Sequence, residues 1–183
     1  MRRRFREKKG RAPNPTGAII DSQSVKGTPE SFLESGFDGG KPVKGRKRHI
    51  IVDTIGCLLV VWVHAANIFD GKAARQVITN LFVLLQTVKI IWADCAYSGA
   101  ELLDWVSSQF GCALEVVKKK KGVRGFHVLP RRWVVERTFA WLGRSRRLSK
   151  DYERKPTSSE AQVYLASARL LLRQICDNQI VYE

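Results

Sequence analysis

Two aspartates, Asp21 and Asp94, each stand at the end of a short apolar run, in "GAIID" and "IIWAD". A carboxylate at the end of a buried strand loses hydration, so a turn, a cation or a metal ion must compensate it. For Asp94 alone, a turn after the strand is a sufficient explanation. If the two strands are parallel neighbours, however, both carboxylates project at one edge of a sheet. Two ionised carboxylates held close together repel, and a divalent cation or protonation of one of them relieves the repulsion.

A third acid, Glu136, lies in a segment that we predict to be helical over residues 131–147, "RRWVVERTFAWLGRSRR". Glu136 falls between two apolar faces of this helix, on a stripe shared with Arg132, Ala140 and Gly143. The small residues on this stripe would let a sugar-phosphate backbone approach the carboxylate. The alternative is an ordinary surface pair between Arg132 and Glu136, which is weak when arginine is on the N-terminal side.

Other chemically capable residues have simpler structural explanations. Asp53 is expected to start a hairpin turn, Asp70 to cap a helix, and Ser98 and Glu101 to form a capping box. The four cysteines are widely spaced without a C-x-x-C motif, which is typical of reduced, buried thiols. The three histidines have no metal-ligand spacing, so the sequence argues against a zinc site.

The charge of the chain favours a polyanionic partner. Its 32 Lys and Arg residues against 17 Asp and Glu give a net charge of +15. The segments 2–11, 41–48, 118–124 and 131–150 hold 24 of the 32 basic residues. The predicted phosphate contacts are Lys41, Lys44, Arg46, Lys47, Arg48, Lys118, Lys119, Lys120, Lys121, Arg132, Arg144, Arg146 and Arg147. For the last three of these arginines, a solvated helix end is an equally good explanation.

The order of the predicted elements indicates a mixed α/β sheet. Residues 1–16 are basic and contain two prolines, so we interpret them as an arm or linker remnant outside the core, and residues 17–183 as one catalytic domain. Strands are expected over residues 17–21, 48–53, 58–66, 89–94 and 113–118, and helices over residues 70–88, 98–110, 131–147 and 157–175. The segment 24–47 is expected to be irregular. Three antiparallel strands followed by two parallel strands, flanked by helices, are the order of the ribonuclease-H-like fold.

Four ordered blocks carry a resemblance to a known family. These are "IIDSQSVKG", "GFDGGKPVKGRKRHIIVDTIG", "IWADCAYSG" and "RRWVVERTFAWLGRSRRLSKDYE". Together, from about residue 17 to residue 175, they resemble the catalytic half of DDE transposases of bacterial insertion sequences, in the insertion sequence five group. The resemblance implies that Asp21, Asp94 and Glu136 are the catalytic triad and that Arg132 is the arginine four positions before the glutamate. Leu129 and Gly143 depart from the family pattern, which has a tyrosine and a basic residue there.

The resemblance also implies an activity and its partners. The expected function is metal-dependent cleavage and strand transfer of DNA, with Asp21, Asp94 and Glu136 holding two Mg²⁺ or Mn²⁺ ions. The expected partners are double-stranded DNA, both the element's ends and its target, further copies of this chain on DNA, and the product of an upstream reading frame that would supply the missing N-terminal DNA-binding region. The alternatives are a catalytically inactive DNA-binding fragment that inhibits transposition, and a ribonuclease-H-like nuclease or junction resolvase.

The sequence also bears on where the protein works. No apolar stretch approaches the ~20 residues of a membrane span, and no apolar segment follows the basic N-terminus as in a secretory signal. We therefore expect a bacterial cytoplasmic protein associated with the nucleoid.

Overall fold

The structure is a computed structural model that describes residues 1–31, 33–117 and 131–176. Its strands are β1 (Gly17–Lys26), β2 (Gly36–Asp38), β3 (Val43–Asp53), β4 (Leu58–Ala65), β5 (Ile90–Ala93) and β6 (Ala113–Val116). Its α-helices are α1 (Arg2–Lys8), α2 (Asp70–Leu84), α3 (Ala100–Phe110), α4 (Trp133–Gly143) and α5 (Pro156–Cys176). Short 3-10 turns are η1 (Pro29–Ser31), η2 (Cys95–Tyr97) and η3 (Arg146–Leu148).

The strands form one mixed sheet with the predicted connectivity. Its order is β2-β3-β1-β5-β6, with β4 paired to β3. The β1–β3 and β3–β4 pairs are antiparallel, whereas the β1–β5 and β5–β6 pairs are parallel. The predicted ribonuclease-H-like arrangement, with three antiparallel strands extended by two parallel ones, is therefore present, and β2 is an additional short strand.

Two expected strands are longer in the structure than their apolar runs. The segment 24–47, expected to be irregular, contains the end of β1, the whole of β2 and the start of β3. The second half of β1 is polar, and it continues as a strand because Asp21–Lys26 stay paired with β3, from Asp21 opposite Ile50 to Lys26 opposite Gly45. Backbone pairing to a neighbouring strand here outweighs the low hydrophobicity of the segment.

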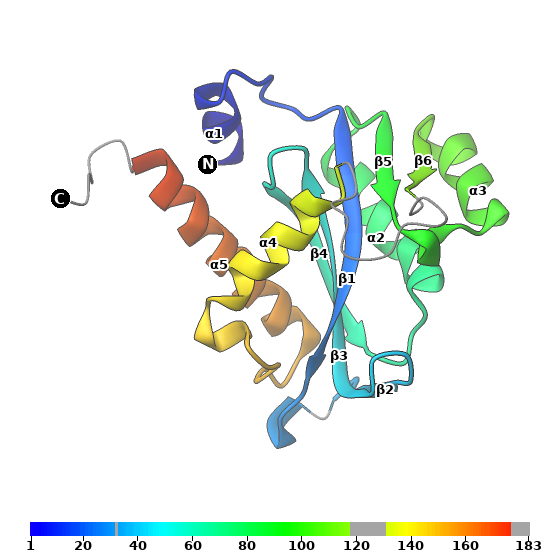
Figure 1. Ribbon diagram of the computed structural model, residues 1–183, viewed down its shortest axis with the longest axis vertical. Helices are drawn as coiled ribbons and strands as arrows, with labels where there is room; N and C mark the ends of the chain where they lie inside the picture. Colours follow the sequence, from blue (N-terminus) through cyan, green and yellow to red (C-terminus); the bar gives the residue numbers. More distant parts are fainter. Residues whose placement is uncertain (32, 118–130, 177–183) are drawn as a thin grey trace, which may run out of the picture.

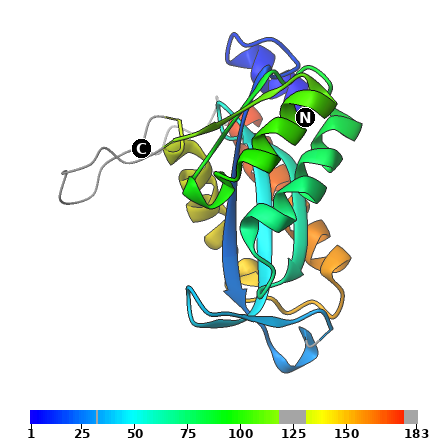
Figure 2. The ribbon, with the colours of Figure 1, turned by 90° about the vertical axis from the view of Figure 1, so that its right-hand side faces the viewer.

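Helices cover both faces of the sheet. Helices α2 and α3 lie on one side, and α4 and α5 lie on the other (Figures 1 and 2). Because successive side chains of a strand point to opposite faces, Ala18 and Ile20 of β1 pack under α2 and α3, whereas Ile19 packs under α4 and α5. A strand buried on both faces needs a continuous apolar run, which explains "GAII" before Asp21.

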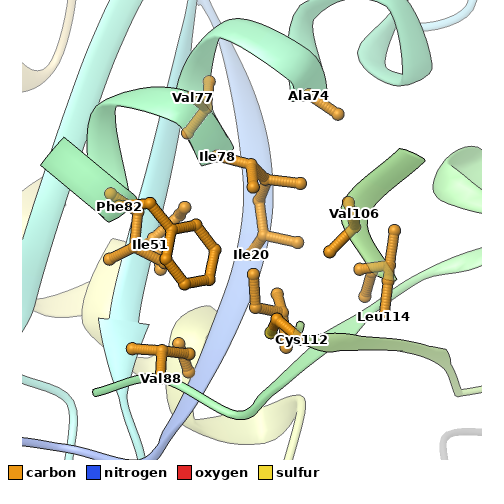
Figure 3. Close-up of a cluster of buried hydrophobic side chains, with 14 of the residues drawn as sticks. Ile20, Ile51, Ala74, Val77, Ile78, Phe82, Val88, Val106, Cys112 and Leu114 are labelled. Atoms are coloured by element: carbon orange, nitrogen blue, oxygen red, sulfur yellow. The ribbon is translucent and has the colours of Figure 1, made fainter. Parts of the chain in front are cut away.

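The larger core lies between the sheet and helices α2 and α3. Ile20 and Ile51 from the central strands meet Val77 and Ile78 of α2 (Figure 3). All four side chains are fully buried, and burial of each contributes about 1.5–3 kcal/mol. This packing fixes β1, the strand that carries Asp21.

Several expected helix ends differ in detail. Phe69, not Asp70, occupies the N-cap of α2, and Gly99, not Ser98, occupies that of α3; neither helix has a side-chain cap. Asp70 instead forms an ion pair with Lys47 at 2.9 Å, and Glu101 accepts a hydrogen bond from Arg75 at 2.6 Å. Both acids were assigned to local caps, but each has a cation from another segment as its partner.

The C-terminal helix buries small residues against the sheet. Ser159, Val163 and Ser167 are the buried positions of α5, while Tyr164 is 42% exposed. The small serines allow α5 to lie close to β4, and Glu160 accepts a hydrogen bond from the backbone of Val63. None of the helices that the structure describes is long and apolar enough to cross a membrane.

The N-terminal segment takes part in the core, contrary to expectation. Phe5 of α1 is only 3% exposed and Arg6 only 5%. Arg6 donates to Asp53 at 2.5 Å, and Lys8 donates to the carbonyl of Ile175 at 2.6 Å. Asp53 also accepts from the backbone of Ile55 and Cys57, which makes it the hairpin-turn residue that the sequence predicted. The boundary at residue 16 stays a prediction, but the arm is packed against the domain.

Candidate active site

The two predicted aspartates lie side by side because of the register of β1 and β5. Ile19 is the Cα partner of Trp92 in this parallel pair. Asp21 and Asp94 are each two residues further on, so they lie at the same level and on the same face as Ile19 and Trp92. That face carries α4. The strands that precede Asp21 and Asp94, β1 and β5, are therefore parallel neighbours, as expected.

Asp21 was expected at the end of its strand, but it lies in the middle of β1. Its side chain is nevertheless 15% exposed, because β5 ends at Ala93 and leaves that side of β1 without a neighbouring strand. The exposure of the carboxylate thus depends on the end of β5 and not on the end of β1.

The two carboxylate oxygens of Asp94 have different surroundings. One carboxylate oxygen, Oδ1, accepts from the backbone N–H of Ala96 at 2.8 Å and caps η2. This is the strand-end turn that the sequence allowed. The other oxygen, Oδ2, faces Arg132 at 3.7 Å. The turn therefore holds the carboxylate in position and leaves one oxygen free of backbone hydrogen bonds.

Helix α4 brings Arg132 and Glu136 to the two aspartates. The Nη2 atom of Arg132 lies 3.3 Å from Asp21 Oδ2, 3.7 Å from Asp94 Oδ2 and 3.7 Å from Glu136 Oε1. All three carboxylates, from positions far apart in the chain, therefore surround one nitrogen atom. The Arg132–Glu136 pair that the sequence offered as an alternative is present, but it is one contact of a four-residue cluster.

The three carboxylates of the cluster differ in their exposure to solvent. The side chains of Asp21, Asp94 and Glu136 are 15%, 31% and 44% exposed. Burial raises the pKa of Asp21 to about 6, and the charge of Asp94 acts in the same direction. The backbone N–H of Ser22 and the guanidinium of Arg132 oppose this rise in pKa. A cation held near Asp21 would therefore stabilise the ionised form of its carboxylate.

The donor set fits a hard divalent cation. Three carboxylates surround one positive group, and carboxylate oxygens are the ligands that Mg²⁺ and Mn²⁺ prefer. Within the described ranges, no three His, Cys, Asp or Glu side chains are grouped closely enough to hold a metal as they stand. The guanidinium of Arg132 lies between the acids, so the fit requires this side chain to move.

Part of the predicted phosphate-binding surface is buried. Arg46, Lys47 and Arg48 are 0%, 5% and 4% exposed, so the prediction was wrong for these three residues. Arg46 binds Asp151 and four further acceptors, and Arg48 donates to the carbonyls of Leu148 and Lys150. Their positive charge stabilises the fold and is not available to DNA.

The other predicted phosphate contacts stay available. Lys41, Lys44, Arg144, Arg146 and Arg147 are exposed, and Arg147 also pairs with Glu153 at 2.8 Å. Lys118, Lys119, Lys120 and Lys121 lie outside the described residues.

Sequence reasoning missed a buried polar cluster beneath the acids. Tyr97 follows Asp94 by three residues and is 1% exposed; burial and the charges of Asp21, Asp70 and Asp94 raise its pKa well above the usual range. His49 and His64 stack in the core and share a hydrogen bond of 2.8 Å. Burial lowers the pKa of both histidines, so they are neutral at pH 7. Only the alternation of "RKRHIIV", which places His49 and Lys47 on one face, could have signalled this cluster.

The acids lie at an open edge and not in a closed pocket. A cavity of about 590 Å³ lies near the start of β1 and β5, and it is lined by residues that include Arg11, Trp92, Arg131 and Trp133 but by none of the three acids. Arg131 stacks on Trp92 at 4.1 Å. An open edge flanked by cations suits an extended polyanion better than a small molecule, which is usually enclosed.

The sheet order and the helices on both faces define a ribonuclease-H-like fold. The family model for the Transposase DDE domain matches residues 12–172, and the chain therefore belongs to this family.

The sequence identity to an individual relative is low. A putative transposase for insertion sequence element IS402 from Burkholderia cepacia is 28% identical over 144 residues. The match covers 74% of this chain and 64% of the relative, so the chain spans less than two thirds of that protein.

Solved structures support the fold. The catalytic core domain of BIV integrase is similar with a TM-score of 0.50 and 13% sequence identity, covering 86% of this chain and 84% of that one. The Mos1 strand transfer complex scores 0.36, which is too low to support a statement about the fold.

Proposed function

We propose that this chain is the catalytic part of a DNA transposase of a bacterial insertion sequence, within the insertion sequence five group. The observation that carries the proposal is the convergence of Asp21, Asp94 and Glu136 around one cationic atom at an open sheet edge. Membership of the Transposase DDE domain family supports it. The reaction would be cleavage of a DNA strand at the element's end, followed by joining of that end to target DNA.

In this proposal each residue of the cluster has a definite task. Asp21, Asp94 and Glu136 would hold two Mg²⁺ or Mn²⁺ ions, and the chemistry that such ions would supply is activation of the attacking hydroxyl and stabilisation of the leaving oxygen of the phosphodiester. Asp21 is anchored in the central strand, Asp94 is oriented by η2, and Glu136 is carried on α4. Three different elements therefore supply the ligands and fix their spacing.

DNA would lie along the edge on which these acids are placed. Lys41, Lys44, Arg144, Arg146 and Arg147, together with Lys118–Lys121, would contact phosphates, which positions the duplex without reading its sequence. Further copies of this chain, and a product of an upstream reading frame, are the expected protein partners on DNA. The proposed location is the bacterial nucleoid.

The test is Mg²⁺-dependent nicking of a duplex that carries the element's end. Asp94→Ala is expected to reduce nicking by at least about a thousandfold, a loss of ~4 kcal/mol of transition-state stabilisation, and to leave DNA affinity within about twofold. Asp104→Ala is the matched control, because Asp104 is exposed on α3 and this variant should nick as wild type does. Normal nicking by Asp94→Ala would refute the assignment.

A catalytically silent DNA-binding protein is the second candidate. The observation in its favour is that Arg132 already compensates the three acids without any ion. This candidate predicts DNA binding with no cleavage in Mg²⁺ or Mn²⁺. A ribonuclease-H-like nuclease would cleave but yield no strand-transfer products.

A further inference from the structure

Arg132 lies among three carboxylates, but its contacts with them are few and long for an arginine. Its Nη2 atom makes one hydrogen bond, of 3.3 Å, to Asp21, and the oxygens of Asp94 and Glu136 are 3.7 Å away. These contacts all involve a single nitrogen and none is a two-pronged pair with one carboxylate, the geometry in which arginine binds carboxylates most strongly.

Arg46 shows how this protein holds a structural arginine. Its two terminal nitrogens make five hydrogen bonds of 2.5–3.3 Å, to Asp151, Ser159 and the carbonyls of Leu33, Glu153 and Arg154. That side chain is completely buried, whereas the side chain of Arg132 is 13% exposed. Arg132 is therefore the more easily displaced of the two.

The three acids depend on Arg132 for compensation. Among the described residues, Arg132 is the only Lys, Arg or His whose side-chain nitrogen lies within 4 Å of a carboxylate oxygen of Asp21, Asp94 or Glu136. A divalent ion bound between these carboxylates would occupy the same space and would repel the guanidinium. The ion and the arginine consequently compete for one position.

The position of Arg132 in the chain allows it to leave. It is the N-cap residue of α4 and directly precedes Trp133, so rotation of its long side chain moves the guanidinium without moving the helix. The open edge beside it is the one along which DNA would lie. A phosphate there offers the bidentate acceptor that the cluster of single contacts does not.

We propose that Arg132 is an exchangeable counter-ion of the active site. It neutralises the acids while no divalent ion is bound, and it transfers to a DNA phosphate when DNA arrives, which opens the carboxylates to metal. DNA and metal then favour each other's binding, and linkage requires the effect to be equal in both directions. This inference rests on the proposed function and adds a regulation of the same site.

The first experiment measures binding of Mn²⁺ to the full chain by calorimetry in the absence of DNA. Arg132→Gln is expected to bind Mn²⁺ at least about tenfold more tightly than wild type, equivalent to about 1.4 kcal/mol. Arg132→Lys retains a charge and should fall in between. Arg169→Gln removes the same charge from an exposed position on α5 and should bind as wild type does.

The second experiment measures the coupling itself. DNA affinity is determined by fluorescence anisotropy with and without Ca²⁺, which takes the same oxygen ligands. Wild type is expected to bind DNA at least about fivefold more tightly with Ca²⁺, in keeping with a coupling of about 1 kcal/mol. In Arg132→Gln this gain should disappear, and in Arg169→Gln it should persist.

The outcomes separate this inference from the proposed function. If no variant binds Mn²⁺ with or without DNA, or if Asp94→Asn binds it as well as wild type, the metal site itself is refuted. If Mn²⁺ binds at the acids with equal affinity in wild type and Arg132→Gln, only the counter-ion inference is refuted. Thermal unfolding of each variant identifies misfolding, and Arg132→Lys supplies the comparison if Arg132→Gln does not fold.

Discussion

Asp21 should lower the stability of the fold at neutral pH. Its pKa is raised to about 6 by burial, against about 3.9 in an unfolded chain. The folded state therefore keeps a proton that the unfolded state loses, and this stabilising contribution is complete below pH 4 and is lost as the pH rises through 6. Above pH 6 the folded protein must hold an ionised, partly buried carboxylate.

Asp21→Asn should consequently stabilise the protein in a pH-dependent manner. Urea unfolding at pH 8 is expected to show a free energy of unfolding about 1–3 kcal/mol higher than wild type, and the difference should shrink as the pH falls toward 4. The variant should also be inactive. An equal effect at both pH values, or a loss of stability at pH 8, would contradict this account of Asp21.

If buried Arg46 is a structural residue and not a DNA contact, its replacement should lower the stability of the fold. Arg46→Met removes the cation that compensates buried Asp151 and leaves three carbonyls without their donor. Breaking a buried pair from one side costs about 3–5 kcal/mol, so chemical denaturation should show a loss of this size. Lys44→Met, at an exposed position two residues earlier, should change stability by less than about 0.5 kcal/mol. Intact stability with weakened DNA binding in Arg46→Met would restore the original prediction.

At the scale of elements, the apolar runs in the sequence predicted the buried parts of the strands. They did not predict the polar parts of β1 and β3. "GAII", "HIIV", "LLVVWV" and "KIIWA" located β1, β3, β4 and β5, and the acids after two of these runs indicated the candidate site. The charged run "RKR" appeared to be surface because consecutive charges usually are. Alternation along β3 instead turns Arg46 and Arg48 toward the segment 148–159 and Lys47 toward Asp70, partners far away in the sequence. The central position of Arg132 among three acids likewise depends on tertiary contacts.

Helix α1 should contribute to stability as an integral element. Phe5 is 3% exposed and lines a small gap with Trp141, Leu170 and Leu171 of α4 and α5. Phe5→Ala should lower the free energy of unfolding by about 2–4 kcal/mol, at or slightly below the usual range for a buried phenylalanine. Arg4→Ala, at an exposed position of the same helix, is the control in the same thermal or urea experiment. Unchanged stability in Phe5→Ala would mean that residues 1–16 behave as the linker that the sequence suggested.

At the scale of the whole molecule, the fold separates structural from available charge. The net charge is +15, but some of the arginines lie in the core and hold loops and helices together. The exposed cations lie on other segments, at the β2–β3 turn and after α4, whereas the three acids lie where β5 ends. In the proposed function, this charge would attract a polyanion to a small negative site, which a divalent ion would convert into a catalytic one.

The most direct test of the account is the position of Mn²⁺ in crystals of the chain bound to DNA, found from anomalous diffraction. We expect anomalous peaks about 2.0–2.6 Å from carboxylate oxygens of Asp21, Asp94 and Glu136, with the guanidinium of Arg132 displaced from between them. Crystals saturated with Mn²⁺ in which Arg132 still lies among the three acids, and in which no peak lies beside them, would contradict the central claim.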